Sequence, residues 1–182
     1  MTDFKSEMRI SRVWAMPNKH TFLIKPIKEL LKELVLDGVG WIDPFAGYYS
    51  PAENTNDLNP QTPTQYHLEA IDFLNKLSGV YIGCLFDPPY SLTQVSKSYK
   101  GMGLKFKGKE NPTGGFPKAK DRISELIQLG GIVISFGWNT IGMGKKRGFE
   151  IEEIIIVSHG GNRNDTLITI EKKVSEIKSQ FK

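Results

Sequence analysis

Apolar residues recur at helical spacing in three stretches of this chain. The clearest stretch begins at Pro26 and ends at Gly38, and its apolar positions, between lysines and glutamates, are Ile27, Leu30, Leu31, Leu34 and Val35. This pattern predicts an amphipathic helix with proline in its first turn and glycine at its end. Further helices are predicted over residues 70–77 and 118–129, the second closed by Gly130-Gly131.

Continuous apolar runs predict strands that are buried on both faces of a sheet. The runs are Val39–Asp43, Val80–Phe86 and Ile132–Phe136, with briefer strands at 55–57 and 66–70. Two β-rich runs near the C-terminus, 149–157 and 166–171, are joined by a glycine-rich, hairpin-like connection. Strands that alternate with helices predict an α/β fold with a doubly wound, mostly parallel sheet, and the last two strands predict a C-terminal antiparallel hairpin.

The chain, residues 1–182, is expected to form a single domain. Residues 1–18 form a predicted N-terminal arm, loosely held up to Arg12, and residues 173–182 a polar tail. The single cysteine, Cys84, excludes a disulfide scaffold and a cysteine-based zinc site within a monomer, and it favours an intracellular location. We expect no metal site, and no apolar run is long enough to predict membrane insertion.

Charge is distributed unevenly although the net charge is only +4. Residues 41–90 contain six carboxylates and one lysine, Lys76, whereas residues 97–120 contain seven lysines and one carboxylate, Glu110. This segregation fits a cationic cofactor in the acidic part and a polyanion over the basic part.

Asp87, Pro88, Pro89 and Tyr90 end the apolar run that begins at Val80. Proline cannot donate to a sheet ladder, so Asp87 is presented at the carboxyl end of a buried strand, where open α/β sheets bind ligands. A planar amino group such as N6 of adenine has two N–H donors, one for the Asp87 carboxylate and one for the Pro88 carbonyl. The Tyr90 ring can stack on the base, and the catalytic residues are therefore expected to be Asp87 to Tyr90.

The earlier strand end, Asp43-Pro44-Phe45-Ala46-Gly47, is typical of a loop that receives an adenosine cofactor. Gly47 has no Cβ, so a ligand can approach its backbone. Only 14 positions separate Asp43 from Asp57, which predicts a short, irregular crossover. Asp57 is expected to accept the ribose hydroxyls.

Residues 91–117 form a predicted basic loop without clean periodicity, in which aromatic residues are interspersed among Lys97, Lys100, Lys105, Lys107 and Lys109. Lysines with aromatics suit phosphate neutralisation and base stacking, although the segment also reads as a disordered insertion. A second basic cluster, Lys145-Lys146-Arg147, is a candidate phosphate contact, and Trp138 is expected either to line the site or to pack in the core.

The order of these motifs resembles DNA N6-adenine methyltransferases of the Asp-Pro-Pro-Tyr type, in particular the compact enzymes of phages and prophages. The resemblance implies a class I, Rossmann-like fold, S-adenosylmethionine as cofactor, DNA as substrate and the cytoplasm of a bacterial or phage-infected cell. It also implies cofactor contacts from residues 43–47, Asp57 and Asp87, from Glu69 at the adenine with Asp72 as the competing candidate, and from Phe22 before the first helix.

The chain departs from that family in three respects. Tyr49 replaces the second glycine of the cofactor loop, the first helix after the loop is missing, and no separate target-recognition domain is present. Sequence recognition would then come from the basic segments, from a protein partner or from a homo-oligomer. An RNA base methyltransferase acting on adenine N6 or guanine N2, and a non-catalytic nucleic-acid-binding module, are the alternatives.

Overall fold

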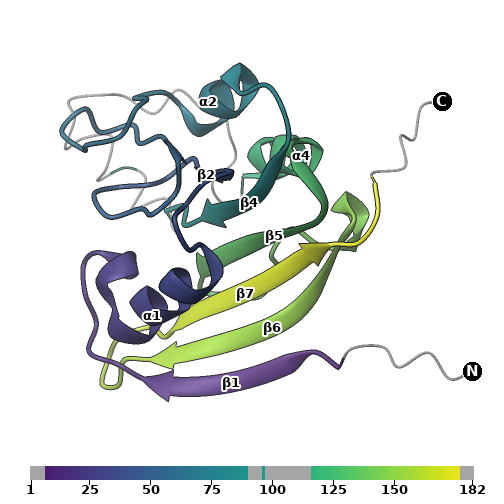
Figure 1. Ribbon diagram of the computed structural model, residues 1–182. Helices are drawn as coiled ribbons and strands as arrows, with labels where there is room; N and C mark the ends of the chain where they lie inside the picture. Colours follow the sequence, from purple (N-terminus) through teal and green to yellow (C-terminus); the bar gives the residue numbers. More distant parts are fainter. Residues whose placement is uncertain (1–6, 90–95, 97–115, 177–182) are drawn as a thin grey trace, which may run out of the picture.

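The computed structural model describes residues 7–89, 96 and 116–176. Seven strands form a sheet in the order β1-β6-β7-β5-β4-β2-β3. Their bounds are β1 Arg9–Trp14, β2 Trp41–Asp43, β3 Asn54–Thr55, β4 Tyr81–Phe86, β5 Ile127–Gly137, β6 Phe149–Ser158 and β7 Thr166–Lys173. Among these strands only β7, which lies between β5 and β6, runs antiparallel to the rest. In Figure 1 its arrow points in the opposite direction to those of β1, β4 and β6. The predicted mostly parallel sheet with a C-terminal antiparallel hairpin is confirmed.

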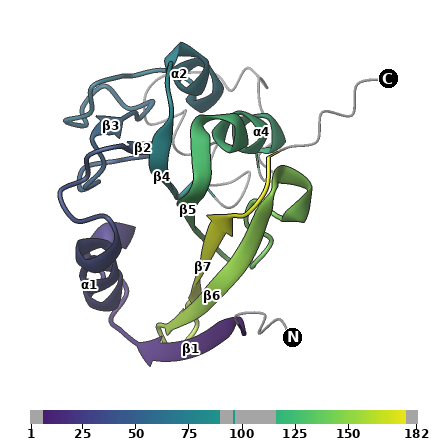
Figure 2. The same cartoon turned by 45° about the vertical axis from the view of Figure 1, so that its right-hand side comes forward.

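Helices cover both faces of the sheet (Figure 2). Each face has its own hydrophobic core. On one face, α1 (Lys25–Leu34) follows the short 3₁₀ helix η1 (Thr21–Leu23) and buries Ile27 and Leu31 against residues of β5 and β7 such as Ile134 and Ile168. On the other face, α2 (Ala70–Lys76) and α4 (Pro117–Leu126) pack on β4 and β5. The pattern of apolar residues every three or four positions therefore marks the buried side of α1, as predicted.

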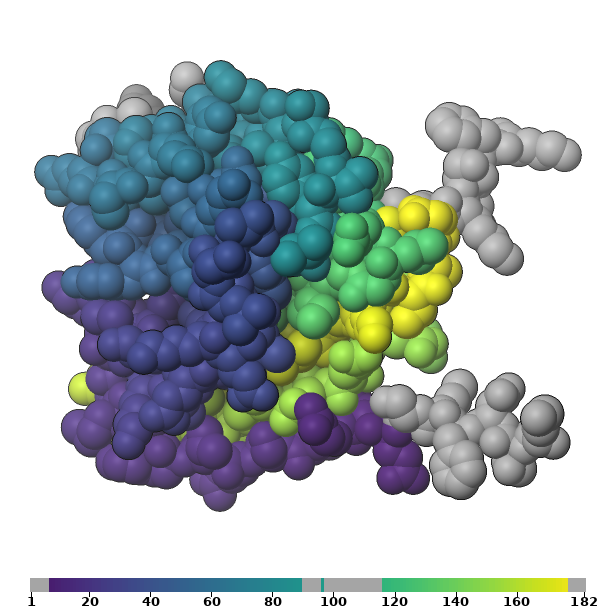
Figure 3. All heavy atoms as spheres, viewed as in Figure 1, coloured from purple at the N-terminus to yellow at the C-terminus, as the bar shows by residue number. Residues whose placement is uncertain are grey.

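The N-terminal arm is more ordered than the sequence predicts. Residues 9–14 form β1, which pairs in parallel with six residues of β6, and Arg9 forms a 2.7 Å ion pair with Glu153. In the space-filling view this strand (purple) runs along the lower border of the molecule (Figure 3). The prediction of a loosely held segment is wrong for residues 9–12, because β1 is held by its backbone ladder, while five of its six residues are exposed and give no burial pattern.

The glycine pair Gly130-Gly131 lies inside β5 and does not close a helix. Helix α4 ends at Leu126, and β5 begins at the next residue. The pairing of β4 with β5 shifts register between Tyr81 and Gly83, so β5 carries additional residues there. Gly130 has φ +78°, and a Cβ on Gly131 would lie 2.6 Å from the Ile127 side chain. These glycines are thus required by a bulge.

The segment around the first crossover is irregular, as expected from its length. Residues 44–53 contain turns and no helix, which confirms that the helix after the predicted cofactor loop is missing. The strand predicted at 66–70 is reduced to a single bridge between Tyr66 and Asn56. Among the described residues, no helix has the length and apolar character needed to cross a membrane.

Candidate functional site

Three predicted site carboxylates come from neighbouring parts of the sheet. Asp43 is the last residue of β2, and Asp87 directly follows β4, with which β2 pairs in parallel. Asp57 lies two residues after β3, the other neighbour of β2. The three residues therefore meet at the carboxyl edge of the sheet, the edge at which open α/β folds bind ligands.

Asp43 is completely buried at this edge. Its Oδ1 accepts a 2.9 Å hydrogen bond from the Phe45 N–H, and its Oδ2 accepts a 2.6 Å bond from the Ser50 hydroxyl. Burial raises the pKa of Asp43 well above its usual range although both hydrogen bonds oppose the shift, and the negative charges of Asp87 and Asp57 raise it further. The charges that a cation at this edge would meet are therefore those of Asp57 and Asp87.

The loop after β2 leaves room for a ligand at Gly47. This residue has φ +56°, and a Cβ built on it would meet no atom within 4 Å. Its N–H donates a 3.0 Å hydrogen bond to Asp57 Oδ2, while Asp57 Oδ1 accepts from the Asn59 N–H at 2.7 Å. Each carboxylate oxygen can accept more than one hydrogen bond, so Asp57 shapes the loop and retains capacity for a ligand.

Asn56 organises the site and was not predicted. Its side chain, 1% exposed, donates to the Pro44 and Leu68 carbonyls at 3.0 Å each and accepts from the Leu68 N–H at 2.9 Å. These bonds tie the loop after β2 to the segment that leads into α2, and so they set the position of Glu69, the N-cap residue of that helix. In the sequence Asn-Asp-Leu-Asn-Pro, Asn56 cannot be distinguished from a turn residue.

The turn after β4 contacts the loop after β2 through aromatic side chains. The Phe86 ring, 2% exposed, meets the Phe45 ring edge-on at a centroid distance of 5.5 Å. Pro88 is buried, and Asp87 and Pro89 are partly exposed. Tyr90 lies outside the described residues. The predicted catalytic and cofactor segments are therefore adjacent in space as far as Pro89.

The segment before α1 reaches the same loop through a residue that the sequence did not single out. The His20 ring lies 4.9 Å from the Tyr49 ring and 5.7 Å from the Tyr48 ring, both in edge-on geometry. Phe22, the predicted ring contact, is 7% exposed and packs on Phe136 at 5.3 Å. Protein thus covers most of the Phe22 ring, while His20 lies directly over the loop.

The second basic cluster is not brought to the carboxyl edge. Lys145, Lys146 and Arg147 form the 3₁₀ helix η2 just before β6. Because β6 is parallel to β4, the start of β6 lies toward the opposite edge of the sheet from Asp87. The predicted lysines of the basic loop, Lys97 to Lys109, lie outside the described residues.

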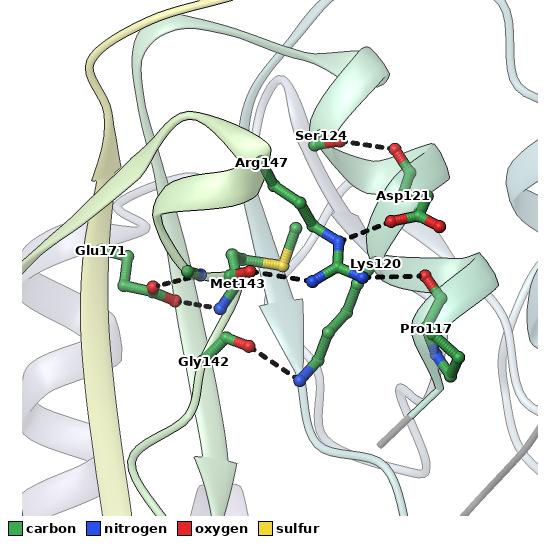
Figure 4. A network of polar contacts seen from close by, with 9 residues as sticks. Pro117, Lys120, Asp121, Ser124, Gly142, Met143, Arg147 and Glu171 are labelled. Carbon is green, nitrogen blue, oxygen red and sulfur yellow. Dashed lines mark hydrogen bonds and ion pairs between the residues drawn. The ribbon is translucent and has the colours of Figure 1, made fainter. Parts of the chain in front are cut away.

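Arg147 is engaged within the protein (Figure 4). Its guanidinium donates to Asp121 Oδ1 at 2.7 Å and to the carbonyls of Met143 and Pro117 at 3.0 and 3.4 Å. The same figure shows Glu171 accepting from the N–H groups of Met143 and Gly144. These bonds hold the β5–β6 connection against α4 and β7, which is a structural role for Arg147.

Two buried charges of opposite sign complete this network. Lys120 Nζ donates to the Gly142 carbonyl at 2.7 Å and lies 5.6 Å from the centre of the Phe86 ring. Burial lowers the pKa of Lys120 and raises that of Glu171, and in each case the other's charge opposes the shift. Through Lys120, this network of hydrogen bonds contacts the Phe86 ring, which directly precedes Asp87.

No protein-family model matches this sequence, and no curated protein matches it. Solved structures are similar. TrmN from Thermus thermophilus superposes with a TM-score of 0.53 at 14% identity over 84% of this chain and 49% of that chain, so this chain spans about half of its length. The putative methyltransferase yhhF from Escherichia coli gives 0.53 at 8% identity over 84% of each chain.

A third similar structure is an rRNA methylase from Streptococcus thermophilus, with a TM-score of 0.50 at 12% identity over 88% of this chain and 100% of that chain. At these identities the comparison concerns the fold alone. The chain has the Rossmann-like fold found in these methyltransferases, with the seven-stranded mixed sheet described above.

Proposed function

We propose that this protein is an S-adenosylmethionine-dependent methyltransferase that modifies the N6 amino group of adenine in DNA. The observation that carries the proposal is the meeting of Asp43, Asp57 and Asp87 at the carboxyl edge of the sheet, around the open backbone of Gly47. A fold shared with methyltransferases supports the same reaction class.

The residues at this edge fit the cofactor. The charges of Asp57 and Asp87 suit its positive charge, and the space at the Gly47 backbone admits a ligand. Asp57 would accept the ribose hydroxyls, and Glu69 or Asp72 would contact the adenine ring. The buried Asp43 would hold the loop in shape from behind, through Phe45 and Ser50. S-Adenosylmethionine, when bound, supplies an electrophilic methyl group on a sulfonium.

The turn after β4 would hold the target base. The Asp87 carboxylate and the Pro88 carbonyl would accept the two N6 hydrogens, and Tyr90 would stack on the ring. These acceptors favour the positive charge that develops on nitrogen during transfer, because a carboxylate and a carbonyl oxygen held in place stabilise positive charge. Positioning of the amine supplies much of the remaining rate enhancement.

RNA is the second candidate substrate, because one structure with the same fold is an rRNA methylase. Incubating the protein with labelled cofactor and, separately, with DNA and RNA distinguishes the two candidates. Identification of the modified base then tests the adenine assignment.

Asp87→Ala tests the site itself. We expect loss of methyl transfer with retained affinity for S-adenosylmethionine in calorimetric titration, because Asp87 acts mainly on the target amine. Asp37→Ala serves as a matched control for loss of an acidic residue, because Asp37 is exposed and precedes β2, at the opposite edge of the sheet, and transfer is expected to persist. Full activity of Asp87→Ala would refute the assignment.

A further inference from the structure

Among the described residues, four aromatic side chains are largely exposed. They are Trp14 at 65%, Tyr48 at 43%, Tyr49 at 49% and Trp138 at 44% relative exposure. The other described Phe, Tyr and Trp side chains are buried or partly buried. We refer to these four residues as the aromatic rim.

All four residues of the aromatic rim lie at one edge of the sheet. Trp14 is the last residue of β1, Trp138 directly follows β5, and Tyr48 and Tyr49 lie in the loop after β2. These strands are parallel to β4, so their carboxyl ends share the edge at which Asp87 lies. In Figure 1 the arrowheads of β1, β4 and β6 point to this edge.

The strand order places Asp87 within the aromatic rim. The β4 strand lies between β5, which leads to Trp138, and β2, which leads to Tyr48 and Tyr49. Neighbouring strands are about 4.8 Å apart, so the three steps from β5 to β1 separate Trp138 from Trp14 by about 14 Å. At about 3.4 Å per stacked nucleotide, that distance corresponds to about four nucleotides.

The chemistry of this edge suits bases that are not paired. Aromatic side chains that follow one another along a surface bind successive unpaired bases by stacking, with little dependence on sequence. Positive charge is available nearby for phosphates, because Lys19 precedes η1 and Arg163 lies in the β6–β7 connection at the same edge, and both are exposed. Paired bases in a duplex do not offer their faces to such a surface.

We propose that the aromatic rim binds unpaired nucleotides that flank the target base, so that the preferred substrate of this protein is single-stranded nucleic acid. The proposal rests on the proposed function for the position of the target base. The nucleotides on either side of the target base would contact the aromatic rim, whereas the target base itself would be held by the turn after β4.

Fluorescence anisotropy with a labelled single-stranded oligonucleotide, and with the same strand annealed to its complement, tests the proposal. We expect tighter binding of the single strand, and quenching of tryptophan fluorescence on binding, because Trp14 and Trp138 are exposed whereas Trp41 is 2% exposed. Trp14→Ala is expected to weaken single-strand binding about tenfold, and Trp14→Phe is expected to retain most of the affinity.

Val80→Ala is the matched control, since Val80 is 69% exposed and precedes β4, at the opposite edge of the sheet. Its affinity is expected to equal that of the wild type. Tighter binding of the duplex, or equal affinities of Trp14→Ala and Val80→Ala, would overturn the proposal. The proposal would also be overturned if Trp14→Ala differed from the wild type in self-association on size-exclusion chromatography but not in its affinity for nucleic acid.

Cofactor titration separates this proposal from the proposed function. Trp14→Ala is expected to bind S-adenosylmethionine like the wild type, because Trp14 is four strand steps from β4. If the wild type neither binds the cofactor nor methylates nucleic acid, the proposed function fails, while rim-dependent binding of the single strand would still support the aromatic rim. If methylation proceeds and rim substitutions leave affinity unchanged, only the present proposal fails.

Discussion

Asp43→Asn should change the pH dependence of stability in a defined direction. Burial raises the pKa of Asp43 in the folded protein above its ordinary value of 3.8. Between these two pKa values the folded protein retains a proton that the unfolded chain has released. Wild-type stability from this group is therefore fully present below the unfolded pKa and is lost as the pH rises toward the folded pKa.

The size of the effect follows from the single proton by which the folded and unfolded states differ at Asp43. Within that pH range the free energy of unfolding of the wild type should fall by about 1.4 kcal/mol per pH unit relative to Asp43→Asn. Asparagine preserves the local bonds, because its carbonyl oxygen can accept from the Phe45 N–H and its amide can donate to the Ser50 oxygen, the partners that Asp43 has. Contributions from titrating groups that do not interact with Asp43 cancel in the difference between the two proteins.

Urea denaturation from about pH 4 to about pH 8 measures the effect, with Trp41 as a buried fluorescent probe. Asp37→Asn is the control, since Asp37 is exposed and accepts a single backbone hydrogen bond from Val39 at 3.1 Å. Parallel pH profiles for wild type and Asp43→Asn would refute the reasoning, because the buried carboxyl would then titrate as in the unfolded chain.

Two further substitutions test the polar contacts that position the site. Asn56→Ala leaves the Pro44 carbonyl and both backbone groups of Leu68 without the Asn56 side chain as partner. We therefore expect a loss of about 3 kcal/mol in the free energy of unfolding. The control Asn75→Ala, at an exposed position of α2, should change this free energy by less than about 0.5 kcal/mol. Glu171→Ala removes the acceptor of two backbone N–H groups and the carboxylate that interacts with buried Lys120, and the expected loss is about 3 kcal/mol or more. In urea denaturation, a Glu171→Ala loss no larger than that of Glu150→Ala, a substitution at an exposed position of β6, would contradict the second expectation.

Features that depend on neighbouring residues could be read from the sequence. Apolar spacing located α1, and uninterrupted apolar runs located β4 and the core of β5, because burial of one helix face or of both strand faces leaves a local pattern. The prolines after Asp87 and the glycine of the loop after β2 marked strand ends. Since carboxyl ends of parallel strands lie at one edge, the joint position of Asp43, Asp57 and Asp87 was predictable as well.

Features that depend on partners far away in the chain required the tertiary structure. Strand β1 is held by a ladder to β6, more than 130 residues later, and carries almost no burial pattern of its own. The direction of β6 decides that Lys145 and Lys146 lie away from the site, and the contacts of Arg147 with α4 decide its structural role. Asn56 joins two loops, and the aromatic rim collects residues from three strands, because only strand order determines which loops meet.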